Sequence, residues 1–208
     1  MKEVLCFGDS NTYGLIPKEN ARFSREIRWT GLVEKELYDR GYRIIEEGLC
    51  GRTTIFEDEL RANRKGCDML PALLESHGLL DIVVLMLGTN DCKSYYHASA
   101  EVIGLGIEKL IEQIRHYSSS IKILLVSPIL LGEQVGQAEF DPEFDSYSVT
   151  TSKQLKSVYE KVARRQNVAF MAASDYACAS EKDQEHLEEE GHRNLSVAMS
   201  SKIMQLGA

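Results

Sequence analysis

The sequence predicts an α/β fold, a three-layer α/β/α sandwich built around a parallel sheet. Apolar runs of strand length recur along the chain, and each is followed by a segment with the spacing of an amphipathic helix. The middle runs, 81–87 and 121–126, show little alternation of polar and apolar residues, which indicates strands covered on both faces. Strand-helix alternation of this kind gives parallel strands joined by right-handed crossovers, with helices on both sides of the sheet.

The expected strands are the apolar runs themselves, which lie at 2–7, 43–47, 81–87, 121–126 and 167–170. Helical spacing follows each run, and we expect helices at 29–40, 68–77, 98–117, 149–165 and 187–206. The third helix has a wide apolar stripe made of Val102, Leu105, Ile107, Leu110, Ile111 and Ile114. The last helix fits the spacing less well, with apolar residues at Leu187, Leu195, Ala198, Met199 and Met204.

Two segments have no regular pattern, and both leave the carboxyl end of a predicted strand. Residues 15–28 are mixed and charged, and residues 129–148 carry Phe140, Phe144 and Tyr147. Long irregular segments in compact domains are often functional loops. Sites in open α/β sheets form at the carboxyl ends of the strands, which is where both segments are expected to lie.

Length and composition fit one globular domain spanning residues 1–208. The chain is 43% apolar and 27% charged, enough apolar material for a core that needs no metal to fold. Acidic residues number 32 and basic residues 24, giving a net charge of −8. An acidic surface repels phosphate backbones and anionic membranes, so we expect neither nucleic acid nor a membrane as partner.

The five cysteines show no CxxC spacing, and the chain enters a strand directly after Met1, without an apolar signal segment. These features favour a reduced, cytoplasmic location in which the cysteines act as small buried hydrophobic residues. The longest apolar stretch, 82–87, is too short to span a bilayer.

Ser10 is the candidate nucleophile. It lies in the turn Gly8-Asp9-Ser10-Asn11-Thr12 after the first apolar run, where a short helix would begin. Backbone N–H groups and a positive dipole end are close to a hydroxyl in that position. The competing interpretation is that Ser10 or Asn11 only caps a helix.

Asp183 and His186 are the candidate orienting acid and base. A serine needs a base, and the base needs a carboxylate that holds its Nδ1–H. A spacing of three lets both side chains point the same way from a turn. The alternative is a solvated acidic segment, because 181–190 is dense in charge, and His192 has no orienting partner at similar spacing.

Gly51, Asn90 and the Ser10 N–H are the candidate oxyanion-hole donors. Ester cleavage builds negative charge on the carbonyl oxygen, and donors aimed at it supply the largest catalytic contribution. Asn90 offers a side-chain amide, and Gly51 offers a backbone N–H that can be approached closely. Taken singly, these residues also fit an ordinary loop and a capped strand-to-helix turn.

Four blocks in this order, around Ser10, Gly51, Asn90 and His186, resemble the signature blocks of the SGNH (GDSL-type) hydrolase superfamily. The runs 46–54 and 80–91, with Arg28-Trp29-Thr30-Gly31, resemble its bacterial arylesterase/acyltransferase branch. The resemblance implies a flavodoxin-like five-stranded sheet in the order 2-1-3-4-5. It implies no cofactor and no metal, and it allows a homo-oligomer, which the arylesterase branch often forms.

The resemblance also implies a function: a serine esterase that hydrolyses or transfers short acyl groups of small-molecule esters. Its triad would be Ser10, His186 and Asp183, and its oxyanion hole Ser10, Gly51 and Asn90. A carbohydrate O-acetyl esterase shares all these residues, and a non-catalytic binding domain would keep only the fold. A metal site formed by acidic residues and histidines has no recognised ligand spacing here.

Two features depart from the resemblance or stay open. Gln184 and Glu185 stand where a glycine and an apolar residue are more usual before the histidine, and a glutamate facing inward could shift the His186 ring. Asp9 is expected to accept backbone N–H bonds in its turn. The sequence leaves open whether Arg28 and Arg52 pair with Asp9 or line the pocket.

Overall fold

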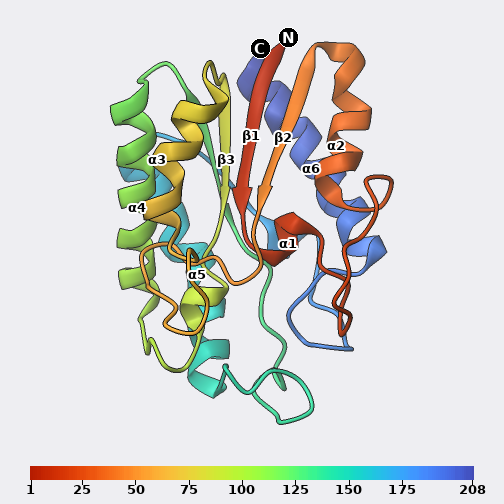
Figure 1. The fold of residues 1–208 in the computed structure, drawn as a ribbon, viewed down its shortest axis with the longest axis vertical. Coiled ribbons are helices and arrows are strands. Elements are labelled where there is room, and N and C mark those ends of the chain that lie inside the picture. The colour runs from red at the N-terminus through yellow and green to blue at the C-terminus, as the bar shows by residue number, and fades with distance from the viewer.

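The computed structural model of residues 1–208 contains one five-stranded parallel sheet in the order β2-β1-β3-β4-β5 (Figure 1). This arrangement confirms the predicted fold class and strand order. Each strand begins within two residues of its expected start. The strands are β1 (Lys2–Gly8), β2 (Tyr42–Gly48), β3 (Ile82–Met86), β4 (Lys122–Ser127) and β5 (Ala169–Ala172).

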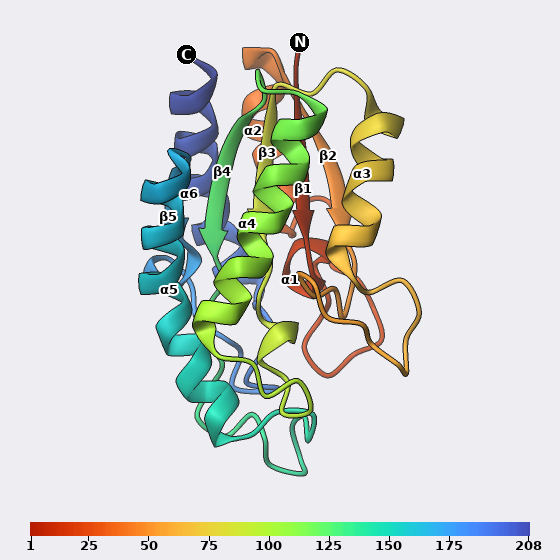
Figure 2. The same cartoon turned by 90° about the vertical axis from the view of Figure 1, so that its left-hand side faces the viewer.

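Helices cover both faces of the sheet and complete the three layers (Figures 1 and 2). One face carries α3 (Gly66–His77), α4 (Ala100–Tyr117) and α5 (Ser146–Gln166), and the other carries α2 (Trp29–Leu37) and α6 (Glu189–Gly207). A separate apolar cluster lies between the sheet and each helical layer, so the strands are buried on both sides. Four short helical elements complete the chain: α1 (Ser10–Tyr13), η1 (Tyr38–Arg40), η2 (Asn90–Cys92) and η3 (Ala173–Asp175).

The buried face of α4 differs from the predicted stripe. Val102 and Leu105 are 40% and 59% exposed, so assigning them to the core was wrong. The buried face of the helix is instead formed by residues three and four positions apart, namely Ile103, Ile107, Leu110, Ile111 and Ile114. Val102 and Leu105 are rotated away from that line. Apolar character alone did not distinguish a core position from an exposed one.

Four helix starts also differ from prediction: α3 begins two residues early, α4 begins two residues late, and α5 and α6 differ as follows. The helix α5 begins three residues early, because Asp145 and Ser148 form a capping box: Asp145 Oδ1 accepts the Ser148 N–H at 2.8 Å, and Ser148 Oγ accepts the Asp145 N–H at 3.1 Å. The irregular segment therefore ends at Asp145. The helix α6 begins two residues late, because Glu188 has an extended backbone and is its N-cap; the Leu187 N–H, which lies before the helix, donates to the side chain of Asn11.

The first three strands end at the same level. Gly8 of β1 is paired with Gly48 of β2 and with Met86 of β3. The segments that follow these strands carry Ser10, Gly51 and Asn90, so the parallel register brings three distant sequence blocks to one edge of the sheet.

Other predictions concern the surface and the cysteines. Cys6 and Cys92 are buried as expected, but Cys50 and Cys67 are half-buried and Cys178 is exposed, so the prediction was wrong for these three.

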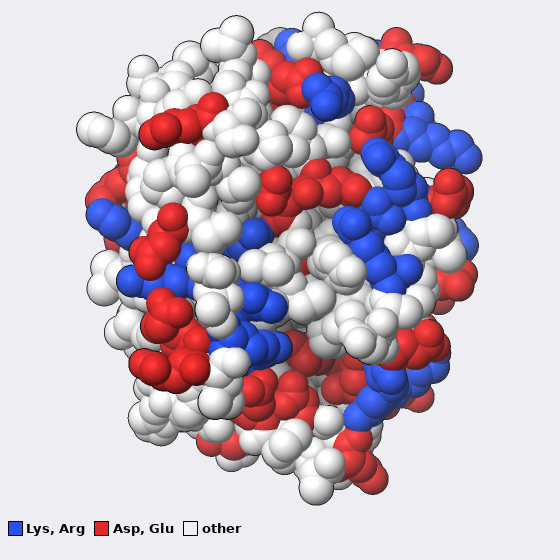
Figure 3. Space-filling view, in the orientation of Figure 1, with Lys and Arg blue, Asp and Glu red and all other residues white.

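Basic and acidic side chains are interspersed over the face seen in Figure 3. None of the helices combines the length and hydropathy that crossing a membrane requires. No three acidic, histidine or cysteine side chains are grouped as metal ligands.

Candidate active site

Ser10 occupies the first position of α1, immediately after β1. Asp9 is the N-cap of this short helix, and its Oδ1 accepts the Asn11 N–H at 3.0 Å. This is the turn-forming role expected of Asp9. The cap fixes the backbone on both sides of Ser10. Ser10 itself is buried, with only 3% of its surface exposed.

Ser10, His186 and Asp183 form a continuous line of hydrogen bonds. Ser10 Oγ lies 2.9 Å from His186 Nε2, and His186 Nδ1 lies 2.8 Å from Asp183 Oδ2. The other oxygen of Asp183 accepts the backbone N–H of Glu185 at 3.0 Å and of His186 at 2.9 Å. One carboxylate therefore orients the ring and also holds the turn from which the ring projects.

Asn11 ties the histidine segment to α1, a role that the sequence analysis missed. Its Oδ1 accepts the Leu187 N–H at 3.0 Å, and its Nδ2 donates to the Glu185 carbonyl at 3.3 Å. The residue that follows Ser10 thus holds the segment that carries His186 in place. The signal in the sequence that could have indicated this role is the position of Asn11 directly after Ser10.

Gln184 adopts the left-handed backbone conformation, with φ of 66°. Glycine takes this conformation without cost, which explains why a glycine would be usual here. Despite the departure, the His186 ring keeps its hydrogen bond to Ser10, so the concern that Gln184 and Glu185 shift the ring does not apply to this structure.

The charges around His186 favour its protonated form. Burial by itself lowers the pKa of the ring, but the carboxylates of Glu185 and Asp183 outweigh burial and raise it to about 9. Burial by itself raises the pKa of Asp183, but the hydrogen bonds from the His186 ring and backbone outweigh it and hold that pKa below its ordinary value. Only the neutral ring can accept a proton from Ser10, and the neutral fraction of His186 grows as the pH rises through about 9.

Gly51 and Asn90 lie in the segments that follow β2 and β3. Gly51 has φ of 83°, a conformation that side chains with a Cβ rarely adopt, so the backbone favours glycine there; the nearest group is the guanidinium of Arg61, whose Cζ would lie 3.0 Å from a Cβ. Asn90 Nδ2 donates to the Arg52 carbonyl at 3.2 Å, which joins the two segments beside Gly51. Asp91 strengthens the junction by accepting the Thr54 N–H at 2.9 Å.

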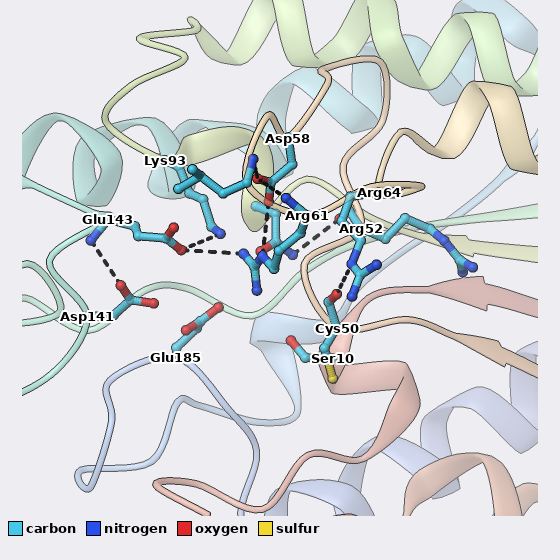
Figure 4. A network of polar contacts seen from close by, with 12 residues as sticks. Ser10, Cys50, Arg52, Asp58, Arg61, Arg64, Lys93, Asp141, Glu143 and Glu185 are labelled. Carbon is cyan, nitrogen blue, oxygen red and sulfur yellow. Dashed lines mark hydrogen bonds and ion pairs between the residues drawn. The ribbon is translucent and has the colours of Figure 1, made fainter. Parts of the chain in front are cut away.

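A network of ion pairs crosses the site above Ser10 (Figure 4). The Glu143 carboxylate forms ion pairs with Lys93 Nζ at 2.5 Å and with the Arg61 guanidinium at 3.4 Å. Arg61 forms a second ion pair, with Asp58, at 3.1 Å. The network links the segments after β2, β3 and β4, which are far apart in the sequence. No motif indicated it, because salt-bridge partners at such separations leave no local pattern.

Three residues left open by the sequence lie outside the line of Ser10, His186 and Asp183. Arg28 forms a buried ion pair with Glu46 at 2.6 Å, and Arg52 donates to the Gly8 carbonyl at 2.8 Å. Neither pairs with Asp9. His192 is fully buried, and its Nδ1 accepts the Trp29 N–H at 3.3 Å.

Comparisons with known proteins point to one family. A model described as the GDSL-like Lipase/Acylhydrolase family matches residues 6–194. The native aryl esterase of M. smegmatis is 32% identical, with TM-score 0.90 over 99% of this chain and 100% of that chain. A carbohydrate acetylesterase from Sinorhizobium meliloti is 37% identical, with TM-score 0.91 over 99% and 100%. A lipase/acylhydrolase from Enterococcus faecalis, at 21% identity and TM-score 0.70 over 99% and 96%, shares the fold. No curated protein matches in sequence.

Proposed function

The chain belongs to the GDSL-like lipase/acylhydrolase family of serine esterases and acyltransferases, and on that premise we propose that Ser10, His186 and Asp183 are its catalytic triad. The protein is a serine carboxylic ester hydrolase acting on small-molecule esters. The observation that supports the assignment of the triad is the pair of hydrogen bonds that joins Ser10 Oγ to His186 Nε2 and His186 Nδ1 to Asp183.

In the first step, His186 Nε2 takes the proton of Ser10 Oγ while that oxygen attacks the ester carbonyl carbon. The negative charge that develops on the carbonyl oxygen is stabilised by the N–H groups of Ser10 and Gly51 and by the Asn90 amide. His186 then protonates the alkoxy oxygen as its bond to carbon breaks. The alcohol leaves, and the acyl group remains on Ser10.

In the second step, water or another alcohol enters the place that the first alcohol left. His186 removes its proton, the oxygen attacks the acyl carbon, and Ser10 recovers the proton when the acyl-oxygen bond breaks. Asp183 stays ionised throughout and stabilises the imidazolium, consistent with its lowered pKa. Hydrolysis and acyl transfer thus differ only in the acceptor.

We extend the proposal to short acyl groups. A pocket of about 230 Å³ is lined by Cys50, the residue before Gly51, together with Tyr13, Leu15, Asn20, Ala21 and Leu49. Its lining is mostly apolar and its volume lies below the range typical of sites for drug-sized ligands, which suits a small acyl chain.

A fluorophosphonate probe tests the assignment of the nucleophile. The probe phosphonylates a serine, with loss of fluoride, only when a base activates the hydroxyl. We expect one adduct per chain, located on Ser10 by mass spectrometry of peptides, and no adduct after denaturation. An intact protein that gives no adduct would support the non-catalytic binding domain instead.

Asn90→Ala tests the oxyanion hole. The substitution removes a donor to the developing charge, and we expect kcat for p-nitrophenyl acetate to fall roughly 10²–10³-fold with a small change in KM. Since Asn90 also binds the Arg52 carbonyl, the melting temperature is measured in parallel. A variant with unchanged kcat would remove Asn90 from the hole.

A carbohydrate O-acetyl esterase is the second candidate. The observation that favours it is the 37% identity, over nearly the whole chain, to the carbohydrate acetylesterase from Sinorhizobium meliloti. Its catalytic steps are those above, with an acetylated sugar as the ester. Rates on acetylated sugars and on simple aryl esters, measured side by side, separate the two candidates.

A further inference from the structure

Glu185 is a buried carboxylate beside the reacting groups, and the mechanism above gives it no task. The residue is 6% exposed, and its Oε1 lies 3.8 Å from His186 Nε2, the nitrogen that faces Ser10. Neither carboxylate oxygen accepts a hydrogen bond from the chain. Buried carboxylates are almost always hydrogen-bonded, and the charged group nearest to this one is the His186 ring, so its free acceptor capacity beside Ser10 calls for an explanation.

The backbone of Glu185 is held at both ends, so the direction of its side chain is fixed. Its N–H donates to Asp183 Oδ1 at 3.0 Å, and its carbonyl accepts from Asn11 Nδ2 at 3.3 Å. In Figure 4 the side chain projects from the histidine segment toward the open space beside Ser10. The carboxylate is therefore presented to the site by the same turn that orients the base.

The nearby cations are already engaged. Lys93 is paired with Glu143 at 2.5 Å, and Arg61 is shared between Glu143 and Asp58. Asp141, the other acidic group on that side, accepts the Glu143 N–H at 2.9 Å. The carboxylate oxygens of Glu185 can therefore accept a hydrogen bond from a donor that does not belong to the chain.

The position of the leaving alcohol relates Glu185 to the substrate. The alkoxy oxygen receives its proton from His186 Nε2, so it must come within about 3 Å of that nitrogen. It then lies no more than about 7 Å from Glu185 Oε1, given the 3.8 Å between Nε2 and Oε1. When the alkoxy oxygen lies on the Glu185 side of the ring, a second polar group on the next carbon of the alcohol can come within hydrogen-bond distance of the carboxylate.

We propose that Glu185 is a specificity-determining residue that selects esters whose alcohol carries a hydroxyl next to the ester oxygen. This inference rests on the proposed triad, because it places the alcohol at His186. The vicinal hydroxyl donates to the Glu185 carboxylate in a charge-assisted hydrogen bond while its neighbour takes the proton from Nε2. An alcohol with a methyl group in place of that hydroxyl leaves the buried carboxylate without a donor, which is the strongest basis for discrimination between isosteres.

The test compares 2-hydroxyethyl acetate with propyl acetate, which differ only by hydroxyl in place of methyl. We expect the wild type to prefer the hydroxyl ester about 10–100-fold in kcat/KM, the scale of a hydrogen bond to a charged group. Glu185→Met fills a similar volume without an acceptor, and its ratio should fall to about one. Glu185→Gln keeps a neutral acceptor and should give an intermediate ratio.

The ratio is informative because both esters use the same base and nucleophile. Removal of the Glu185 charge also changes the pKa of His186, and that change alters both rates equally and cancels. Glu181→Gln is the matched control: it removes one negative charge from an exposed residue of the same segment, and its ratio should equal that of the wild type. If Glu185→Met does not fold, Glu185→Gln alone decides.

A second measurement uses the acceptor step. With p-nitrophenyl acetate as donor, the wild type should acetylate ethane-1,2-diol more readily than propan-1-ol, and Glu185→Met should lose that preference. A wild-type ratio of one, or a preference that is undiminished in Glu185→Met or in Glu185→Gln, would overturn the role of Glu185. Hydrolysis that persists without the Ser10 hydroxyl would instead overturn the proposed function, so the two failures are distinguishable.

Discussion

Ser10→Ala is expected to lower kcat for p-nitrophenyl acetate about 10⁵-fold, down to the rate that binding and the oxyanion hole alone supply. The substitution removes the atom to which the acyl group is transferred. Ser10 Oγ has a single hydrogen-bond partner, His186 Nε2 at 2.9 Å, so the fold loses only about 1 kcal/mol. Steady-state kinetics with a melting curve on the same sample separate the two effects.

Ser127→Ala is the matched control for that experiment. Ser127 ends β4 at the same edge of the sheet, is buried, and its Oγ has no hydrogen-bond partner. The same chemical change there should leave kcat within about twofold of the wild type, since no reacting group is touched. If Ser10→Ala kept wild-type turnover, or if Ser127→Ala lost as much, Ser10 would not be the nucleophile.

Asp183→Asn is expected to lower kcat roughly 10³–10⁴-fold while KM stays nearly constant. The Asn oxygen can still accept the backbone N–H groups of Glu185 and His186, which keeps the turn in place. Its amide NH₂ then faces His186 Nδ1 and forces the ring into the tautomer with a proton on Nε2. That nitrogen can no longer accept the proton of Ser10.

The paired variant Asp183→Ala removes the turn contacts as well. It should match Asp183→Asn in kcat but melt at a lower temperature, because two backbone N–H groups lose their acceptor. Asp175→Asn changes an exposed carboxylate that pairs only with Lys156, and should leave both properties close to wild type. A kcat for Asp183→Asn within tenfold of the wild type would contradict the orienting role.

Much of the fold was readable from local pattern. The unbroken apolar runs of β3 and β4 predicted strands covered on both faces, because a solvated face would have required polar residues at alternate positions. The order of the strands was not readable from pattern, and only resemblance to a family supplied it. The errors came from local features that were misread: Leu105 is an apolar residue that lies off the buried face of its helix and points to solvent, and the early start of α5 comes from a capping box.

The site divides in the same way. Ser10, Gly51, Asn90 and His186 each stand in a short motif beside a strand end or a turn, so their residue types and neighbours marked them out. The sequence could not show that Glu185 is unpartnered, because that depends on the cations of other segments being engaged. The ion pairs of Glu143 with Lys93 and Arg61 join segments that only folding brings together.

The nucleophile and its base are separated by 176 positions along the chain. During synthesis Ser10 is translated well before the segment with Asp183 and His186. A growing polypeptide that has not yet reached His186 therefore carries the Ser10 hydroxyl without its proposed base. By the same logic, products terminated before His186 are expected to lack esterase activity.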